Sequence, residues 1–283
     1  MTLTITGCIR SNKCKAIVLA ADSRCSNNVE VEDTSTKIHQ AGNYIGVTNS
    51  GRKFVGDQLT SIHSFIDSIT AQIKNKDPEK VAEELAMSLK SINSADVSLL
   101  IAGYELPGED IGSFGSFHRV EHNKLFCVPK PDYAAQGSGN KILDEVFSSL
   151  RLWLDGSPWS IKWLKNTRPE KLELFLKNLA VNDNLQPDDK ERLRDIANRF
   201  RPQASPFLRK DWKNTELKDV IETMRQMIEF ASLLDYDNFY RIMCLKEPSQ
   251  KSAFHGIGGP IDIAVIDLYD GFYWHSKKIV IKP

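Results

Sequence analysis

Residues 16–24 read Ala-Ile-Val-Leu-Ala-Ala-Asp-Ser-Arg, an unbroken apolar run that ends in charge. A run of this kind, without polar alternation, predicts a strand that is buried on both faces. Asp22 follows that strand directly, so we expect its carboxylate to be paired with a cation rather than solvated. Lys37, fifteen residues later, is the expected partner. The alternative is that both residues are ordinary turn or surface charges.

The flanking segments predict further strands and two helices. Strands are expected at about 2–9, 29–37 and 43–48. Apolar residues then recur every three or four positions from 54 to 73, which predicts a helix opened by Gly51. Asp77 and Pro78 supply a cap and a first-turn proline for a second helix, which should run to about residue 92.

The rest of the chain adds strands and helices in an irregular order. Strands are predicted at 97–104, 117–122, 124–128, 260–267 and 272–281, and helices at 142–154 and 215–234. Residues 155–215 are charged and interrupted by prolines, and they predict a helical insertion. The order differs from regular βαβ alternation and predicts an α+β fold, a four-layer αββα sandwich of two sheets between outer helices. We expect one domain over residues 1–283 that contains the insertion.

The composition is that of an ordinary globular protein, with 41% hydrophobic and 26% charged residues. The 37 basic and 37 acidic side chains balance, which argues against nucleic acid or an anionic membrane as a general partner. No apolar run is long enough to span a bilayer, and no signal-peptide pattern opens the chain. Five cysteines without a CxxC motif fit a reducing compartment. We therefore expect a cytoplasmic protein without a cofactor.

Histidines offer the one hint of a metal site in the sequence. His118 and His122 are close together, but they fall in a predicted hairpin without carboxylates or thiols around them. Such clusters are what zinc sites require, so no metal site is expected.

Thr2 can form a nucleophilic site with Asp22 and Lys37. Removal of Met1 is favoured before a small side chain, and it would give Thr2 a free α-amine with a pKa of about 7.7–8.0 before perturbation. A nearby Lys37 ammonium would disfavour the protonated amine, which could then act as the general base for the threonine hydroxyl. Asp22 would hold Lys37 in place, and a backbone N–H at Gly51 would stabilise an oxyanion by about 3 kcal/mol.

Several motifs follow one another in a familiar order. They are Thr2, the segment 16–24, Thr-Lys-Ile at 36–38, Asn-Ser-Gly at 49–51, the strand at 97–103, Gly-Ser-Gly at 137–139 and Gly-Gly-Pro at 258–260. Together they resemble the proteasome β-subunit family of N-terminal nucleophile (Ntn) hydrolases. The resemblance covers roughly residues 2–150 and 215–283, and the segment 16–24 is its most specific part.

The resemblance implies an Ntn-hydrolase sandwich and a threonine peptidase. Thr2 would be the nucleophile, Asp22 and Lys37 the orienting charges, Gly51 the oxyanion donor and Ser138 a supporting hydroxyl. It also implies a peptide or other amide substrate and self-association into rings or dimers. Whether an ATPase partner exists is left open.

The spacing at the N-terminus departs from the family pattern. Asp22 follows Thr2 by about four residues more than in the family. Either the turn at 10–15 is enlarged, or Thr4 or Thr6 stands in the nucleophile position, because an even shift keeps the same strand face.

Two other departures concern activity. The family's Asp-x-x-Ser before the Gly-Gly turn is replaced at its two polar positions by Phe254 and Ile257, and the insertion at 155–215 has no counterpart in a minimal family member. Three functions therefore stay open. The leading one is an N-terminal threonine amide hydrolase, in the first instance a peptidase. The others are a catalytically inactive assembly subunit and an amidohydrolase for a small molecule.

Overall fold

The computed structural model describes the chain in several segments. They are residues 3–10, 15–26, 31–56, 59–73, 77–94, 96–105, 116–127, 133–136, 191, 216–233 and 257–277. The predicted helix at 142–154 lies outside them, and so does the predicted insertion at 155–215 apart from Glu191.

The first sheet is built around the apolar segment that precedes Asp22. Its five antiparallel strands lie in the order β12 (Tyr133–Gln136), β1 (Thr4–Arg10), β2 (Lys15–Asp22), β13 (Ile261–Asp267) and β14 (Gly271–Ser276). β2 occupies the centre, and every residue of it after Lys15 is buried. The predicted strand buried on both faces is thus confirmed. A central, two-sided position explains why the sequence of β2 lacks polar alternation.

The second sheet also has five antiparallel strands. Their order is β11 (Lys124–Cys127), β10 (Ser116–Glu121), β9 (Val97–Gly103), β6 (Ile45–Gly51) and β5 (Ile38–Gly42). Two short ribbons complete the described strands, β3 (Cys25–Ser26) with β4 (Val31–Glu32) and β7 (Phe54–Val55) with β8 (Thr60–Ser61).

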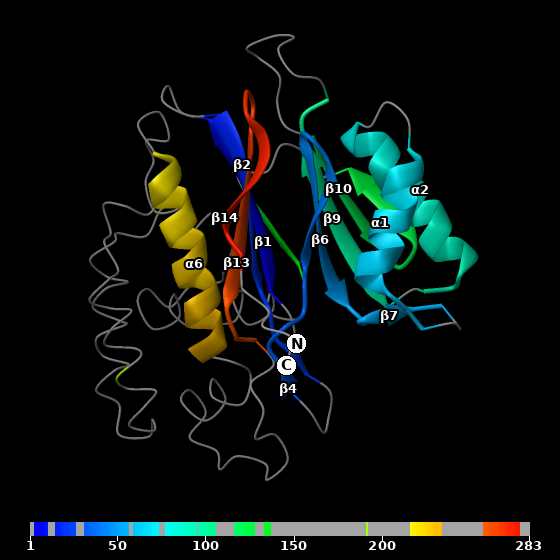
Figure 1. Cartoon of the computed structure of the whole chain (residues 1–283), viewed down its shortest axis with the longest axis horizontal. Coiled ribbons are helices and arrows are strands. Elements are labelled where there is room, and N and C mark those ends of the chain that lie inside the picture. The colour runs from blue at the N-terminus through cyan, green and yellow to red at the C-terminus, as the bar shows by residue number, and fades with distance from the viewer. Residues whose placement is uncertain are drawn as a thin grey trace, which may run out of the picture.

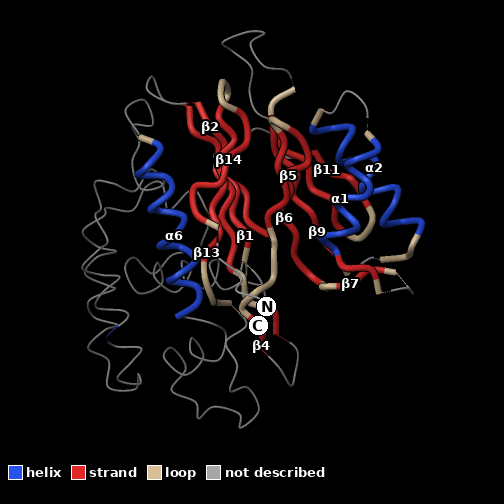
Figure 2. Tube along the Cα trace, in the orientation of Figure 1, coloured by secondary structure: helices blue, strands red, loops and turns tan. Residues whose placement is uncertain are grey.

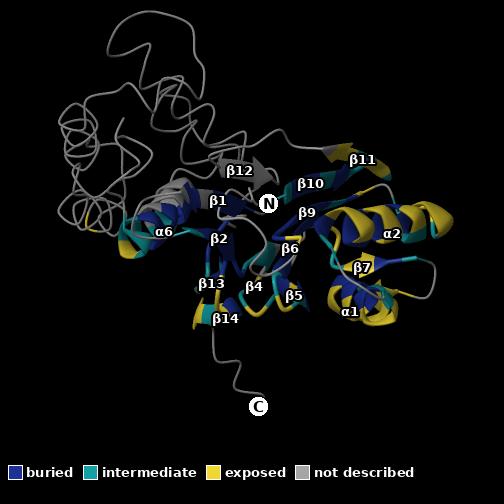
Figure 3. Cartoon of the chain, turned by 90° about the horizontal axis from the view of Figure 1, so that it is seen from above, coloured by how far each residue is buried: buried dark blue, intermediate teal, exposed yellow. Residues whose placement is uncertain are grey.

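The two sheets face each other, and helices cover their outer faces (Figures 1 and 2). Helix α6 (Leu217–Leu233) packs on β1, β2 and β13, whereas α1 (Ile62–Gln72) and α2 (Pro78–Ser91) pack on the second sheet. Figure 3 shows that α1 and α2 bury their inner sides and expose their outer sides, as expected for amphipathic helices. None of the helices in the described segments is both long and apolar enough to cross a membrane.

Two apolar cores hold these layers together. One fills the space between the sheets and includes Ile17, Leu19, Ile38 and Phe117. The other lies between the second sheet and its helices, and includes Ile66, Leu85 and Leu99. Their side chains are almost completely removed from water, and so are those of Ile221, Met224 and Ile228 on α6, which packs on the outer face of the first sheet.

Two hairpin turns meet at the ends of β5 and β13 that lie away from Asp22. The backbone N–H of Phe272 donates to the carbonyl of Asn43 at 2.6 Å. The hydroxyl of Tyr44 donates to the carbonyl of Tyr269 at 3.1 Å. These bonds join the turn of the β13–β14 hairpin to the turn of the β5–β6 hairpin, and so connect one sheet to the other.

The predicted helix at 54–73 is wrong in its first half. Residues 54–55 and 60–61 form the β7–β8 ribbon, and α1 begins at Ile62. Leu59 adopts a left-handed conformation with φ of 51°, which no helix interior allows. Ser61 then caps α1 by accepting a hydrogen bond from the Ser64 N–H. By contrast, α2 begins at Pro78 with Asp77 as its cap, as predicted.

The predicted strand at about 29–37 is also wrong over most of the part that is described. Only Val31–Glu32 forms a short strand there, and the sheet strand begins at Ile38. The Ser35 N–H donates to the carbonyl of Ser23, and Asp33 accepts two hydrogen bonds from Arg24. The Ser35 N–H is therefore bonded to the turn after β2 and not to a strand of the second sheet.

Candidate functional site

Asp22 and Lys37 form the buried ion pair that the sequence predicts. Lys37 Nζ lies 2.9 Å from Asp22 Oδ1, and the two residues are 3% and 1% exposed. Asp22 ends β2 in the first sheet, whereas Lys37 directly precedes β5 in the second. The alternative of separate surface charges is therefore wrong. A pair removed this far from water requires additional hydrogen bonds to offset its desolvation.

The Asp22 carboxylate obtains those hydrogen bonds from two distant backbone groups. Oδ1 also accepts from the Leu3 N–H at 2.8 Å, and Oδ2 accepts from the Gly258 N–H at 3.2 Å. Burial raises the pKa of the Asp22 carboxyl, while the Lys37 charge and the two N–H groups act in the opposite direction. The charge of Asp22 is thus supported by three donors from three separate segments.

Lys37 is held from a second side by the turn that follows β2. Its Nζ donates to the carbonyl of Arg24 at 2.5 Å. The guanidinium of Arg24 in turn forms a paired contact with Asp33, with Nε–Oδ1 at 2.7 Å and Nη2–Oδ2 at 2.9 Å. This contact lowers the pKa of Asp33. A bidentate pair of this kind fixes orientation as well as charge, so the Arg24 carbonyl is a well-positioned acceptor for Lys37.

The β1–β2 hairpin shows which residue faces Asp22. Thr4 pairs with Ala21, and the register continues without a break to Arg10 opposite Lys15. The Asp22 N–H donates to the Leu3 carbonyl at 3.2 Å, so Leu3 is the residue opposite Asp22. Thr4 and Thr6 lie inside β1, which is paired on both sides, and both are fully buried.

Gly51 ends β6 at the same edge of the second sheet as Lys37. The Asn49 N–H donates to the Lys37 carbonyl at 3.0 Å, and Gly51 follows two residues later. Its φ of 101° is a left-handed conformation that glycine adopts without strain. A Cβ on Gly51 would lie 2.0 Å from the Asp96 carbonyl oxygen, so no larger residue fits. Gly51 is therefore a strand end and does not start a helix.

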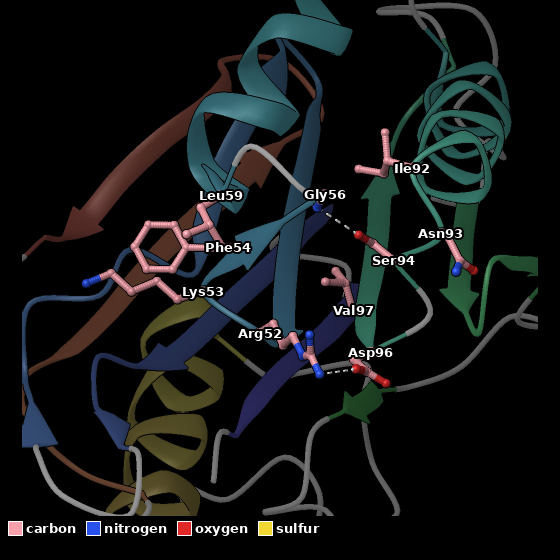
Figure 4. A pocket seen from close by; sticks show the side chains of 10 residues that line it. All are labelled: Arg52, Lys53, Phe54, Gly56, Leu59, Ile92, Asn93, Ser94, Asp96 and Val97. Carbon is pink, nitrogen blue, oxygen red and sulfur yellow. Dashed lines mark hydrogen bonds and ion pairs between the residues drawn. The ribbon is translucent and has the colours of Figure 1, made fainter.

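A hollow of about 360 Å³ begins at the residue after Gly51 (Figure 4). Arg52 and Asp96 form an ion pair of 2.9 Å at one side of it, and the Gly56 N–H donates to the Ser94 hydroxyl at 3.1 Å. The other lining residues are Lys53, Phe54, Leu59, Ile92, Asn93 and Val97. Asp22 and Lys37 are not among them, so this hollow is a neighbour of the ion pair and not its own pocket.

Two of the predicted site residues, Thr2 and Ser138, lie outside the described residues. The structure thus brings together Asp22 and Lys37, with Gly51 on the same sheet edge. It adds Arg24 and Gly258, whose contacts the sequence reasoning did not anticipate. The sequence carried a signal for both, since Arg24 ends the charged segment and Gly258 begins a Gly-Gly-Pro turn.

The chain matches no model of a protein family and none of the curated proteins.

Proposed function

We propose that the protein is an N-terminal threonine amide hydrolase of the proteasome-like Ntn type, with Thr2 as nucleophile and a peptide as the first substrate class. One observation carries this proposal. A single carboxylate oxygen of Asp22 binds both the Lys37 ammonium, at 2.9 Å, and the Leu3 amide, at 2.8 Å. The residue bonded to that amide nitrogen is Thr2.

Chain connectivity limits how far Thr2 can be from Lys37. The carbonyl carbon of Thr2 is about 1.33 Å from the Leu3 nitrogen, which is itself held beside the oxygen that binds Lys37. Thr4 and Thr6 have no such relation to Asp22, because Leu3 is its opposite residue. The extra residues between Thr2 and Asp22 are then accommodated as a longer hairpin, which favours Thr2 over the other two positions.

The proposed reaction proceeds in two steps. The free amine of Thr2 takes the proton of its own hydroxyl, and Oγ attacks the carbonyl carbon of the amide. The N–H of Gly51 stabilises the oxyanion. The amine of the substrate then leaves with the proton that the Thr2 amine took up, and the acyl group of the substrate remains as an ester on Thr2 Oγ. Water then hydrolyses the ester and restores the hydroxyl. Lys37 lowers the proton affinity of the amine, Asp22 holds Lys37, and Ser138 supplies a supporting hydroxyl.

The layered architecture supports the same proposal. Two antiparallel sheets lie face to face between helices, and the ion pair joins them at one edge. This arrangement is consistent with the αββα sandwich of Ntn hydrolases and with the self-association into rings or dimers that the resemblance implies. A likeness of layers alone would not carry a function.

Covalent labelling tests the proposal directly. The purified full chain is treated with an epoxyketone or a β-lactone, and the intact mass and the modified residue are determined by mass spectrometry. We expect loss of Met1 and one adduct on Thr2. Thr2→Ala should abolish the adduct, whereas Thr2→Ser should retain it. Retention of Met1, or an adduct that survives in Thr2→Ala, would exclude Thr2 as the nucleophile.

A second candidate is a catalytically inactive assembly subunit. One observation favours it: Ile257, which has no hydroxyl and is fully buried, occupies the position where the family uses a serine beside its Gly-Gly turn. Its carbonyl instead accepts a hydrogen bond from Ser232 on α6 at 3.0 Å. An unlabelled protein that retains Met1 and forms stable oligomers would favour this candidate. An adduct with activity only on small amides would favour the amidohydrolase.

A further inference from the structure

His39 turns one ring nitrogen, Nδ1, toward helix α1. It lies in β5 with 2% of its surface exposed, and its Nε2 is 2.7 Å from Oδ1 of Asn49. An amide oxygen only accepts hydrogen bonds, so Nε2 of His39 carries the hydrogen and Nδ1 keeps its lone pair.

His63 meets that nitrogen from the first turn of α1. Its Nδ1 is 2.8 Å from Nδ1 of His39, and its Nε2 is 3.3 Å from a carboxylate oxygen of Asp67. His63 and Asp67 are four residues apart on the helix, so both side chains lie on one face. The contact between the two Nδ1 atoms is of hydrogen-bond length, and the ring tautomers decide which of them carries the hydrogen. If neither Nδ1 carries a hydrogen, their lone pairs repel each other unless a cation lies between them.

We propose that His39, His63 and Asp67 form a site for a divalent transition metal, with Zn²⁺ as the best-matched ion. One ring nitrogen from each histidine and one oxygen of Asp67 lie within 4.8 Å of one another. Two imidazoles and a carboxylate are a usual protein ligand set for zinc, with water in the fourth position. Two nitrogens bound to one tetrahedral zinc at about 2.0–2.1 Å lie roughly 3.3 Å apart, so the 2.8 Å between the two Nδ1 atoms must widen by about 0.5 Å to admit the ion.

The surroundings of the cluster favour a metal over a casual contact. Asn49 fixes the ring and the tautomer of His39, which is the role of the outer hydrogen-bond partners in metal sites. His39 is rigidly buried, whereas the side chains of His63 and Asp67 are about half exposed, at 54% and 52%. The site therefore combines one fixed ligand with two that can adjust, and it is open to ions from solvent.

The proposal does not depend on Thr2 chemistry, although the two sites share a residue. The side chain of Asn49 holds His39, and its backbone N–H donates to the carbonyl of Lys37 at 3.0 Å. Metal binding would act on the strand that carries Lys37, but the test below requires no activity.

Calorimetric titration with Zn²⁺ tests the site in the full chain after treatment with chelator. We expect the wild type to bind one more equivalent of Zn²⁺ than His63→Ala, and Asp67→Asn to bind that equivalent at least tenfold more weakly. The control is His275→Ala, which removes an exposed histidine of β14 and should bind as the wild type does. All three changes are at exposed or half-exposed positions, and circular dichroism checks that each variant is folded.

Either of two results would overturn the metal site. One is the absence of saturable Zn²⁺ binding in the wild type, in which case a proton bridges the two histidines. The other is binding that His63→Ala and Asp67→Asn leave unchanged while both variants remain folded. Co²⁺ gives an independent readout, because nitrogen ligation in a tetrahedral site should produce visible absorption that His63→Ala lacks.

Discussion

The backbone N–H of Gly258 donates to Oδ2 of Asp22 at 3.2 Å, although the two residues are 236 positions apart in the chain. Gly258 also accepts a hydrogen bond from the same segment, because the Arg24 N–H, two residues after Asp22, donates to the Gly258 carbonyl at 3.0 Å. The loop before β13 therefore holds both the carboxylate and the turn that carries the Arg24 carbonyl. Since that carbonyl binds Lys37, Gly258 supports both ends of the ion pair.

Lys37→Met should destabilise the protein by about 3–5 kcal/mol, because it leaves the buried Asp22 carboxylate without its counter-charge. Adding Asp22→Asn removes the second charge and should recover much of that loss, while hydrolysis remains absent in both variants. Urea unfolding measures the stability. Lys53→Met breaks a half-exposed pair with Glu32 and serves as the control, with an expected loss below about 1 kcal/mol. Equal losses in the two single variants would contradict the prediction.

Thr6→Val should stabilise the protein by about 1 kcal/mol or more. The hydroxyls of Thr4 and Thr6 are buried, and neither has a hydrogen-bond partner within the described segments. Removing such a group recovers its desolvation penalty. Thr70→Val is the matched control, because the Thr70 hydroxyl donates to the Ile66 carbonyl at 2.9 Å and its removal should cost about 0.5–1 kcal/mol.

The same variant also tests the nucleophile position. If Thr2 is the nucleophile, Thr6→Val and Thr4→Val should retain inhibitor labelling and activity. If Thr6→Val is folded but has lost both inhibitor labelling and activity, Thr6 and not Thr2 is the nucleophile.

Gly51→Ala should be more damaging than Gly56→Ala, although both glycines have positive φ. A Cβ at Gly51 would lie 2.0 Å from the Asp96 carbonyl oxygen, whereas at Gly56 its nearest neighbour would be Ile92 at 3.7 Å. We expect about 1–2 kcal/mol of conformational strain at Gly56 and clearly more at Gly51. Thermal unfolding of the two variants measures the difference, and equal effects would show that the backbone at Asp96 yields readily.

Stability should fall as the pH drops from about 6.5 to 4, in part because of His39. Its pKa in the folded protein, about 4, lies below its ordinary value of 6.5, so the unfolded chain binds the proton more tightly in this range. His39 therefore contributes about 3 kcal/mol to the free energy of unfolding above pH 6.5, and this contribution is lost as the pH falls to about 4. Urea unfolding of the wild type and His39→Gln, both with EDTA, should give a steeper pH dependence for the wild type. Parallel curves would contradict the prediction.

The sequence predicts features that depend on neighbouring residues. The apolar run at 16–21 has no alternation, because β2 is central and covered on both faces. Burial of that run is what makes a solvated Asp22 implausible, so the ion pair follows from one strand. Asp77 and Pro78 likewise define the start of α2 on their own.

Other features depend on contacts that no local pattern records. The apolar periodicity from 54 to 73 continues through the β7–β8 ribbon, and the left-handed conformations of Gly56 and Leu59 and the cap at Ser61 separate ribbon from helix. Gly258 lies 236 residues from Asp22, and His39 lies 24 residues from His63. His118 and His122 stand out in the sequence because they are four residues apart, whereas His39 and His63 are brought together only by packing.

The joined hairpin turns at Asn43 and Phe272 have a mechanical consequence. Sheets that pack face to face share no backbone ladder, so nothing in strand pairing prevents one from sliding over the other. Here the Phe272–Asn43 hydrogen bond joins the sheets at one end of the strands, and the Asp22–Lys37 ion pair joins them at the other end. If one sheet slid over the other by one residue, about 3.3 Å, both interactions would break. The alignment of Lys37 with Asp22 is therefore maintained in part by a contact at the opposite rim of the molecule.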